Sequence, residues 1–261
     1  MQTYPQIKPT KEPWFRSAVR ILNEGKLAFA REVIVIAAAY FIYMFTRKLV
    51  FHDAAEDVAF RHAETLISFQ MKVFTLWEPA VQDWLFDNAR WALYVFNWIY
   101  IFTFWPVIGT TAIFLFHANR KRYKFYRNVV LITFVVALVI FMMFPLAPPR
   151  MMPQYGFIDS IEDLGPGFYA SRSAQAYYNA FAAMPSLHFG WTLLFGIMFW
   201  RTGALWLKFL GVIYPLSTFI AIVATGNHYG VDALGGGVMV LIAVAIYQTL
   251  IYRRRKYVEQ I

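Results

Sequence analysis

Apolar runs of about twenty residues recur along this chain, and an α-helix needs a run of that length to cross the hydrocarbon of a bilayer. The runs lie roughly at 30–51, 92–116, 128–145, 184–200, 203–224 and 230–252. Because a spanning helix satisfies its own backbone hydrogen bonds, we expect an all-α polytopic membrane protein with six transmembrane helices. Charged residues make up only 15% of the chain, against about 25% in an average soluble domain. There is no cysteine, which excludes disulfides and thiolate metal sites.

The stretch 53–90 lies between the first two runs and has a different pattern. Charged residues are interspersed with apolar ones at helical spacing, and this predicts an amphipathic helix lying in the membrane interface. The apolar residues concerned are Phe60, Leu66, Ile67, Phe69 and Met71. Tryptophans favour the headgroup level, so Trp77, Trp84 and Trp91 are expected to anchor this helix and the next span there.

The rest of the chain gives no sign of a second domain. Segment 146–182 contains Pro, Gly and Tyr residues and predicts a long ordered loop over one face of the helices. The glycines at 235–237 predict a close contact between two helices. Because there is neither an internal repeat nor a low-complexity linker, residues 1–261 are expected to form one domain.

The distribution of positive charge predicts how the helices are oriented. If the N-terminus is inside, the inner segments are 1–32, 117–128, 201–208 and 253–261, and they hold 17 of the 24 Lys and Arg residues. Cytoplasmic loops are enriched in these residues, so both termini are expected in the cytoplasm of a multi-pass cell-membrane protein. Cations at the ends of apolar runs also explain the net charge of +9 without a nucleic-acid partner.

Two short motifs place histidines where an apolar run meets a loop. They are Met184-Pro185-Ser186-Leu187-His188 and Thr225-Gly226-Asn227-His228-Tyr229-Gly230-Val231-Asp232. A third motif, Pro145-Leu146-Ala147-Pro148-Pro149-Arg150, places an arginine at another such boundary. In the orientation above, all three fall at the outer ends of their helices, so we expect an active site on the outer, non-cytoplasmic face.

These residues suffice for phosphoryl transfer through a covalent phosphohistidine. His228 and Asp232 are four residues apart and share one helix face. The carboxylate can therefore accept from one ring nitrogen and leave the other free to attack phosphorus. His188 would protonate the leaving alkoxide and then act as base toward the acceptor. Arg150 would bind phosphate oxygens, helped by the Ser186 hydroxyl and by two helix N-termini.

Other interpretations of these residues are open at this stage. A histidine at a membrane boundary is often structural, and Arg150 could extend to the headgroups from a helix end. Asp232 is harder to explain in this way, because a carboxylate within a spanning segment is costly. His188 and His228 could instead be the axial ligands of a haem, which would leave Asp232 and Arg150 without clear roles. A transporter is a third alternative, although these residues lie at the rim rather than at the midplane.

The motifs resemble those of the type 2 phosphatidic acid phosphatase superfamily, which includes acid phosphatases and haloperoxidases. Its Pro-Ser-Gly-His-like element is similar to Pro185–His188, its His-x-x-x-Asp element to His228–Asp232, and its upstream cation to Arg150. The Pro-Pro-Arg, Pro-Ser-Leu-His and Gly-Asn-His-Tyr sequences look more similar still to the fungal and protozoan inositol phosphorylceramide synthase branch. The resemblance covers roughly 145–235. It implies that His228 is the nucleophile and that no metal or other cofactor is needed.

Two departures from the superfamily pattern bear on the reaction. The lysine seven residues before the arginine is Met143 here, and the arginine six residues before the second histidine is Ile222. A phosphomonoester is close to a dianion at neutral pH, so a site with fewer cations suits the single charge of a phosphodiester. We therefore expect transfer of a phospho-headgroup from a phospholipid donor to a lipid alcohol, as in sphingolipid synthesis. The alternative acceptor is water, as in a lipid phosphate phosphatase.

Overall fold

A computed structural model describes residues 14–50, 53–73, 75–165 and 180–258. These residues form helices, turns and loops with no strand, which confirms the expected all-α class. One isolated parallel bridge pairs Leu146 with Ala182. The chain divides into two compact units, Met1–Phe45 and Thr46–Ile261, and the expectation of a single domain stays a prediction.

The first unit consists mainly of one helix, α1 (Trp14–Val50), whose last residues extend into the second unit. Within it, Gly25–Thr46 is long and apolar enough to cross a membrane. The helix begins well before the predicted run 30–51, because strong helix formers such as Lys26, Leu27 and Ala28 precede that run.

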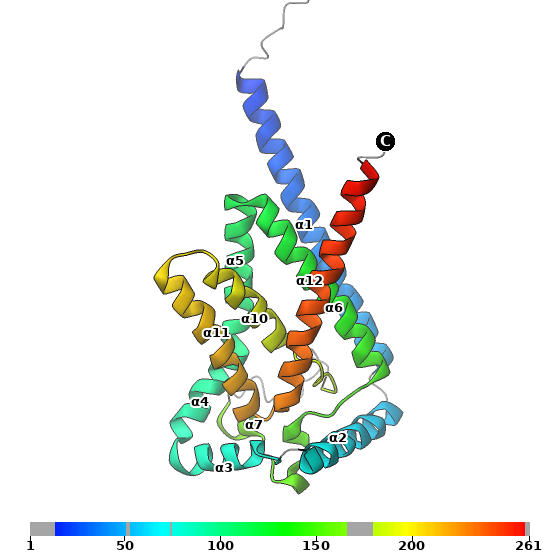
Figure 1. The fold of residues 1–261 in the computed structure, drawn as a ribbon, viewed down its shortest axis with the longest axis vertical. Coiled ribbons are helices and arrows are strands. Elements are labelled where there is room, and N and C mark those ends of the chain that lie inside the picture. Colours follow the sequence, from blue (N-terminus) through cyan, green and yellow to red (C-terminus); the bar gives the residue numbers. More distant parts are fainter. Residues whose placement is uncertain (1–13, 51–52, 74, 166–179, 259–261) are drawn as a thin grey trace, which may run out of the picture. The chain divides into compact units, whose positions relative to one another are not determined.

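The second unit contains the other helices (Figure 1). They are α2 (Asp53–Val73), α3 (Glu78–Asn88), α4 (Arg90–Trp98), the π-helical turn η1 (Ile99–Thr103), α5 (Phe104–Ala118), α6 (Arg120–Met143), α10 (Leu187–Trp200), α11 (Leu205–Ala224) and α12 (Gly230–Val258). Four segments here could cross a membrane, namely Arg90–Ala118, Arg120–Met143, Leu205–Ala224 and Gly230–Ile251. With the segment in α1, the described residues therefore contain five candidate spans.

The predicted count of six spans is not confirmed, because the helix found at 184–200 is short. Residues 184–186 belong to the loop before α10, which has only 14 residues. A helix of that length is about 21 Å long at 1.5 Å per residue. The hydrocarbon core of a bilayer is about 30 Å thick, so α10 does not cross it alone.

α10 packs against α11, α12 and α6 inside the second unit. Glycines allow these close approaches: a β-carbon on Gly190 would lie 2.8 Å from the carbonyl oxygen of Gly236 on α12. A β-carbon on Gly196 would likewise lie 2.6 Å from the carbonyl oxygen of Gly211 on α11. The helix contact expected at 235–237 is confirmed, and the tight packing fixes the register of α10 between its two neighbours.

The region predicted as one amphipathic helix forms two helices, α2 and α3. Residues 75–77 separate them, and Pro79 lies in the first turn of α3, where a proline favours starting a helix over continuing one. α2 is amphipathic as expected, but its buried face packs against protein. The residues buried on that face are Ala59, Ala63, Ile67 and Gln70. Phe69 and Met71 are exposed instead.

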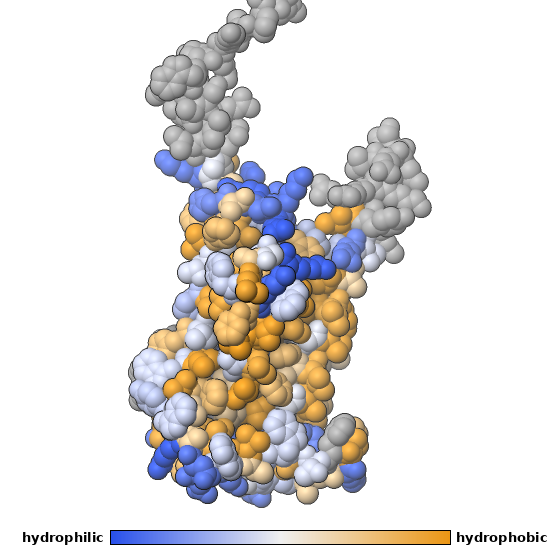
Figure 2. All heavy atoms as spheres, turned by 60° about the vertical axis from the view of Figure 1, so that its left-hand side comes forward, coloured by the Kyte–Doolittle hydropathy of each residue, from blue (hydrophilic) through white to orange (hydrophobic). Residues whose placement is uncertain are grey.

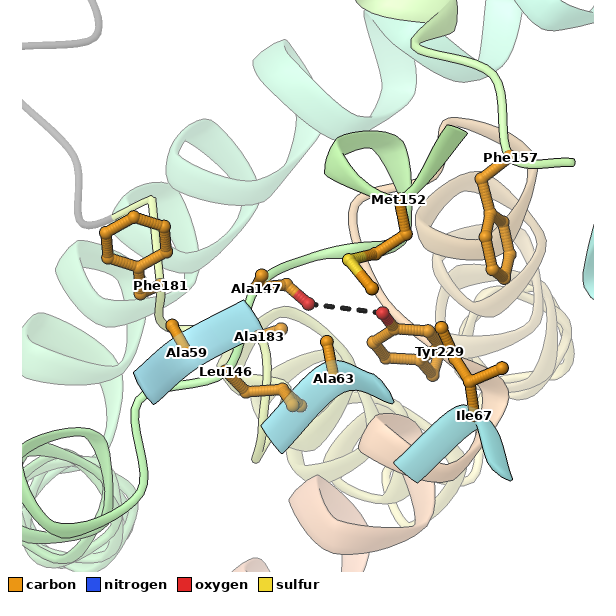
Figure 3. Close-up of a cluster of buried hydrophobic side chains, with 10 residues drawn as sticks. All are labelled: Ala59, Ala63, Ile67, Leu146, Ala147, Met152, Phe157, Phe181, Ala183 and Tyr229. Atoms are coloured by element: carbon orange, nitrogen blue, oxygen red, sulfur yellow. Dashed lines mark hydrogen bonds between the residues drawn. The ribbon is translucent and has the colours of Figure 1, made fainter. Parts of the chain in front are cut away.

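A hydrophobic cluster joins α2 to the loop that follows α6 and to the residue before α12 (Figure 3). Its buried members are Ala59, Ala63, Ile67, Leu146, Ala147, Met152, Phe157, Phe181, Ala183 and Tyr229. The backbone N–H of Leu146 donates to the carbonyl of Phe181 at 2.9 Å, and that of Ala147 donates to the carbonyl of Ala59 at 3.2 Å. These contacts hold the chain firmly where α6 ends.

The described part of the predicted loop 146–182 is ordered, whereas residues 166–179 lie outside the described residues. It contains two single 3₁₀ turns, η2 (Pro149–Met151) and η3 (Pro153–Tyr155), and the short helix α7 (Ser160–Leu164). Buried side chains of α3 and α4 hold it in place. Gln82 donates to the carbonyl of Ile158 at 3.1 Å, and Asn97 donates to the carbonyl of Ser160 at 2.8 Å.

Hydrophobic side chains form a broad band over the face seen in Figure 2, and hydrophilic ones gather both above this band and at its lower end. Figure 1 places α2 and α3 at that end. Trp84 and Trp91 are exposed, with 61% and 73% of their surface accessible. Their expected role as headgroup anchors stays a prediction.

Candidate active site

The five residues singled out in the sequence come together at one end of the second unit, where α10 and α12 begin and α11 ends. His188 is the second residue of α10, Asp232 lies in the first turn of α12, and His228 lies in the turn between α11 and α12. Ser186 is the N-cap of α10, and Arg150 lies in η2. Helices that run in opposite directions and are joined by a five-residue turn bring these chain positions to the same end.

His228 is buried and its ring is held by two acceptors. Its Nδ1 atom lies 2.7 Å from the carbonyl oxygen of Ala183 and 3.5 Å from Oδ2 of Asp232. A carbonyl oxygen can only accept, so Nδ1 carries the hydrogen, and in the neutral ring Nε2 keeps the lone pair. The sequence predicted that Asp232 alone would orient this ring. The Ala183 carbonyl is the nearer partner.

Asp232 is fully buried and also fixes the backbone of the turn. Its Oδ2 atom accepts the N–H of Tyr229 at 2.8 Å, and its own carbonyl accepts the N–H of Ser186 at 3.0 Å. Its Oδ1 atom is buried and has no hydrogen-bond partner among the described residues. The aspartate therefore ties the start of α12 to the start of α10, in addition to lying beside His228.

His188 is oriented by rings rather than by hydrogen bonds. Its ring centroid lies 4.5 Å from that of Tyr100 and 4.2 Å from that of Phe104, with interplanar angles of 27° and 36°. The centroid of His228 lies 6.1 Å away. Within the described part of the chain, neither ring nitrogen of His188 has a hydrogen bond. The structure thus brings the two histidines together.

Arg150 is nearly buried, with 9% of its side chain accessible, and lies on the turn that carries His228. Its backbone N–H donates to the carbonyl of Gly226 at 2.8 Å, and its Nε atom makes a long hydrogen bond of 3.4 Å to Oδ1 of Asn227. Nε also lies 4.0 Å from Oδ2 of Asp159. These contacts fix the guanidinium beside the histidine turn.

Gly226 is needed for this approach. Its φ of +66° lies in the left-handed region that side chains disfavour, and a β-carbon there would lie 2.9 Å from the carbonyl oxygen of Ile158 and 3.2 Å from Cβ of Arg150. Any side chain at 226 would therefore push η2 and the loop at 158 away from the histidine turn.

Ser186 is completely buried, and its Oγ atom accepts the N–H of Phe189 at 3.3 Å as a helix cap. Its hydroxyl hydrogen can still donate, so its role as a phosphate ligand stays a prediction. The N-terminus of α12 was also expected to bind phosphate, but this is wrong for two backbone N–H groups there, because carboxylates already accept them. Asp232 accepts that of Tyr229, and Glu78 accepts that of Gly230 at 3.1 Å.

Glu78 is a buried carboxylate that the sequence analysis did not select. Its Oε1 atom accepts from Gly230 and from the side-chain amide of Gln70 at 2.9 Å, while Oε2 has no partner among the described residues. Glu78 follows Trp77 at the start of α3, where an acidic residue is common, so no sequence pattern placed it against α12.

The Tyr229 side chain connects the histidine turn to a neighbouring segment of the site. Burial raises the pKa of its phenol, and the nearby Asp232 carboxylate raises that pKa further. The phenol therefore stays protonated and donates to the carbonyl of Ala147 at 3.2 Å (Figure 3). This bond ties the residue after His228 to the segment that leads to Arg150.

Sequence reasoning missed several other residues of the site. Ala183 contributes only a backbone carbonyl, which no sequence pattern reveals. Tyr100 and Phe104 are two aromatics in an apolar span that contains many. Asn227 precedes His228 directly, and this adjacency was the one usable signal for it.

The arrangement brings two imidazoles and a guanidinium together. One imidazole, whose Nε2 has no hydrogen bond among the described residues, lies beside a second whose ring nitrogens have none there either, and a guanidinium adjoins the turn that carries the first. Such a set can attack a phosphorus atom, protonate a leaving oxygen and stabilise negative charge.

Comparison with known proteins gives one match. The family model of the PAP2 superfamily matches residues 64–246, more than two thirds of the chain, and this range includes every residue of the site. No curated protein and no solved structure matches this chain.

Proposed function

The chain belongs to the PAP2 superfamily, and because this membership suggests a lipid phosphatase or phosphotransferase, we propose that it is a lipid phosphotransferase. The reaction moves a phospho-headgroup from a phosphodiester phospholipid to a lipid alcohol. The observation that carries the proposal is the hydrogen bond from Nδ1 of His228 to Ala183, because it leaves Nε2 as the nucleophilic nitrogen beside His188. Membership in this superfamily supports neither the haem alternative nor the transporter alternative.

In the first step Nε2 of His228 attacks phosphorus, and the bond from phosphorus to the diacylglycerol oxygen breaks. His188, in its protonated form, gives its proton to the departing alkoxide. Asp232 and the Ala183 carbonyl hold Nδ1 and stabilise the positive charge that forms on the ring. Arg150 and the Ser186 hydroxyl bind the phosphate oxygens, where negative charge accumulates. The product is a phosphohistidine that still carries the headgroup.

In the second step the acceptor alcohol attacks phosphorus from the side the leaving group vacated. His188, now neutral, takes the alcohol proton, and the bond from phosphorus to Nε2 breaks. Both histidines return to their starting protonation states. The chain's own residues perform each proton transfer in this sequence, and we propose that the reaction needs no metal ion.

The balance between transfer and hydrolysis depends on charge at the site. Ile222 is completely buried, and its carbonyl accepts the backbone N–H of His228 at 3.0 Å, so this apolar position adjoins the nucleophile. Met143 is 78% exposed, so its identity is no measure of the charge inside the site. With an isoleucine at 222 and Arg150 as the nearby cation, the site suits a phosphodiester monoanion better than a phosphomonoester dianion.

The membrane setting also favours a lipid acceptor. The histidine pair lies at one end of a multi-pass bundle of apolar helices, so an alcohol dissolved in the bilayer reaches it laterally and competes with water. The resemblance to inositol phosphorylceramide synthases supports a sphingoid-type alcohol as acceptor. The charge distribution supports a site on the non-cytoplasmic side, with both termini in the cytoplasm.

A four-way rate measurement tests the proposal. The purified protein is given a phosphodiester phospholipid or phosphatidic acid, each with and without a long-chain lipid alcohol, and products are identified by mass spectrometry. We expect headgroup transfer to the alcohol from the phosphodiester donor and little phosphate release from phosphatidic acid. His228→Ala is the matched control and should give neither product. Faster phosphate release from phosphatidic acid, unaffected by the alcohol, would identify a lipid phosphatase instead.

A further inference from the structure

The two histidines of the site are held by different physical means. His228 is fixed through Nδ1 by the Ala183 carbonyl and Asp232. His188 has no hydrogen bond to either nitrogen among the described residues, yet a general acid must direct one nitrogen at the leaving oxygen. Something other than a hydrogen bond must therefore fix the plane of its ring.

Two aromatic rings contact His188, and both come from the same stretch of chain. Tyr100 lies in η1 and Phe104 is the first residue of α5, four positions later. Residues four apart lie on one side of a helix, and both ring centroids are within 4.5 Å of the imidazole centroid. The Tyr100 ring stacks on the imidazole at 27° and the Phe104 ring is tilted at 36°, and these two contacts restrict rotation of the imidazole.

The π-helical turn at 99–103 lies directly at this contact. Such turns are rare inside α-helices and occur frequently at functional sites, because they shift side chains out of the regular helical positions. Here the continuous segment Arg90–Ala118 is regular on both sides of η1, and the irregular turn carries Tyr100.

A second layer of side chains holds Phe104 in place. Phe104 is 4% exposed and stacks on Trp191, with centroids 5.7 Å apart and an interplanar angle of 7°. The indole N–H of Trp191 donates to Oγ1 of Thr133 on α6 at 2.7 Å. Phe104 is thus packed between the imidazole and an indole that is itself fixed by a hydrogen bond.

We propose that Tyr100 and Phe104 are positioning residues that hold the His188 ring in the plane required for proton transfer to the leaving alkoxide and from the acceptor. This inference rests on the proposed function, because it assigns His188 the acid–base role. The two aromatic residues influence the rate only through His188. Their influence on the leaving-group step is therefore larger when the leaving group must be protonated.

The test compares two leaving groups in leucine and conservative variants. Tyr100→Leu and Phe104→Leu remove the flat rings, whereas Tyr100→Phe keeps one. Each variant is assayed for kcat and KM with a phospholipid donor, whose alkoxide must be protonated, and with a nitrophenyl phosphodiester, whose leaving group departs without a proton. Phosphohistidine formed in each variant is measured in parallel after a rapid quench.

We expect kcat for the phospholipid to fall about ten-fold or more in both leucine variants, since general acid catalysis supplies roughly 10²–10⁴-fold. With the nitrophenyl donor, nitrophenol release in the first turnover should keep the rate of the unaltered protein, because it precedes the step in which His188 takes the acceptor proton. Tyr100→Phe should restore phospholipid turnover. Phe102→Leu is the matched control: it lies on the same turn, is 40% exposed and stacks on Trp98 with centroids 4.7 Å apart. It should leave both rates unchanged.

Equal losses with both donors would overturn the inference, since that is what a purely structural defect produces. Unchanged phospholipid turnover in both leucine variants would overturn it as well. Failure of the proposed function gives a different result, namely no phosphohistidine in the unaltered protein or full turnover in His228→Ala. The two failures are therefore distinguishable.

Discussion

His228 donates its Nδ1 hydrogen to the carbonyl oxygen of Ala183 at 2.7 Å, across 45 positions of sequence. Ala183 precedes the Pro185–His188 motif, so this single bond joins the two histidine motifs through the backbone of one and the side chain of the other. It also selects the tautomer of His228 without any charged group. The nucleophile proposed here is therefore set by the fold of the loop before α10.

Replacing His228 by alanine should abolish turnover, because the variant has no atom to form the bond to phosphorus. Phosphohistidine should also disappear when the protein is quenched during reaction with donor. His117→Ala is a suitable control, since His117 is exposed near the end of α5. Substantial headgroup transfer by His228→Ala would rule out the covalent mechanism.

Replacing Asp232 by asparagine should reduce kcat by about 10²-fold, less than the roughly 10⁴-fold seen when the only orienting aspartate of a serine-hydrolase triad is lost. The reason is that the Ala183 carbonyl still holds Nδ1 in the variant. An asparagine oxygen can also accept the N–H of Tyr229, so the turn should keep its shape. Steady-state rates with one donor suffice for the measurement. Activity as low as that of His228→Ala would contradict the claim that Ala183 and Asp232 together orient the His228 ring.

The fold was largely predictable from hydrophobic pattern, and the errors have local causes. Run length predicted six transmembrane helices, and five of these runs form helices that can cross a membrane. In the remaining run, residues 184–186 belong to the loop in which Ser186 caps α10. Pro79 divided the predicted interfacial helix into two. Both errors occur where a capping residue or a proline overrides apolar periodicity.

Glu78→Ala should destabilise the protein by about 1–3 kcal/mol, because it leaves the buried N–H of Gly230 and the amide of Gln70 without an acceptor. Glu78→Gln keeps an acceptor oxygen and should be milder. Thermal unfolding in detergent compares both with Asp83→Ala, which alters an exposed acid of the same helix. Equal stability of Glu78→Ala and Asp83→Ala would show that the buried contacts contribute nothing.

The orientation of the protein can be measured by thiol labelling, since the chain has no cysteine of its own. Gln154 and Lys121 are both exposed, the first in η3 near the site and the second at the start of α6. An impermeant thiol reagent should label Gln154→Cys in intact cells and Lys121→Cys only after permeabilisation. The reverse pattern would place the site on the cytoplasmic side.

Chelation of divalent cations should leave the rate of transfer unchanged. No group of three or more His, Asp or Glu residues that could hold a metal occurs in the part of the chain that the structure describes. The measurement is turnover before and after dialysis against a strong chelator. A loss of activity that added Mg²⁺ or Zn²⁺ restores would contradict the proposed mechanism.

The candidate site was predictable in its two histidines, Asp232 and Arg150, but not in Glu78 or in the groups that orient the two rings. The motifs located His188, His228, Asp232 and Arg150, because polar groups at the ends of apolar runs are conspicuous. The carbonyl of Ala183 and the rings of Tyr100 and Phe104 left no comparable signal. Orientation by backbone and by aromatic packing depends on contacts between distant segments, which one sequence does not display.

The shortness of α10 has a consequence for where chemistry occurs. At about 21 Å it falls about 9 Å short of the hydrocarbon thickness. If its far end lies at one membrane surface, His188 lies below the opposite one, on the side where residues 145–149, 183, 185 and 186 are buried. A phospholipid would then have to move deeper into the membrane, or the bilayer would have to become thinner locally, before its phosphorus could reach His228. Bilayer thickness itself would become a variable that sets the rate of reaction.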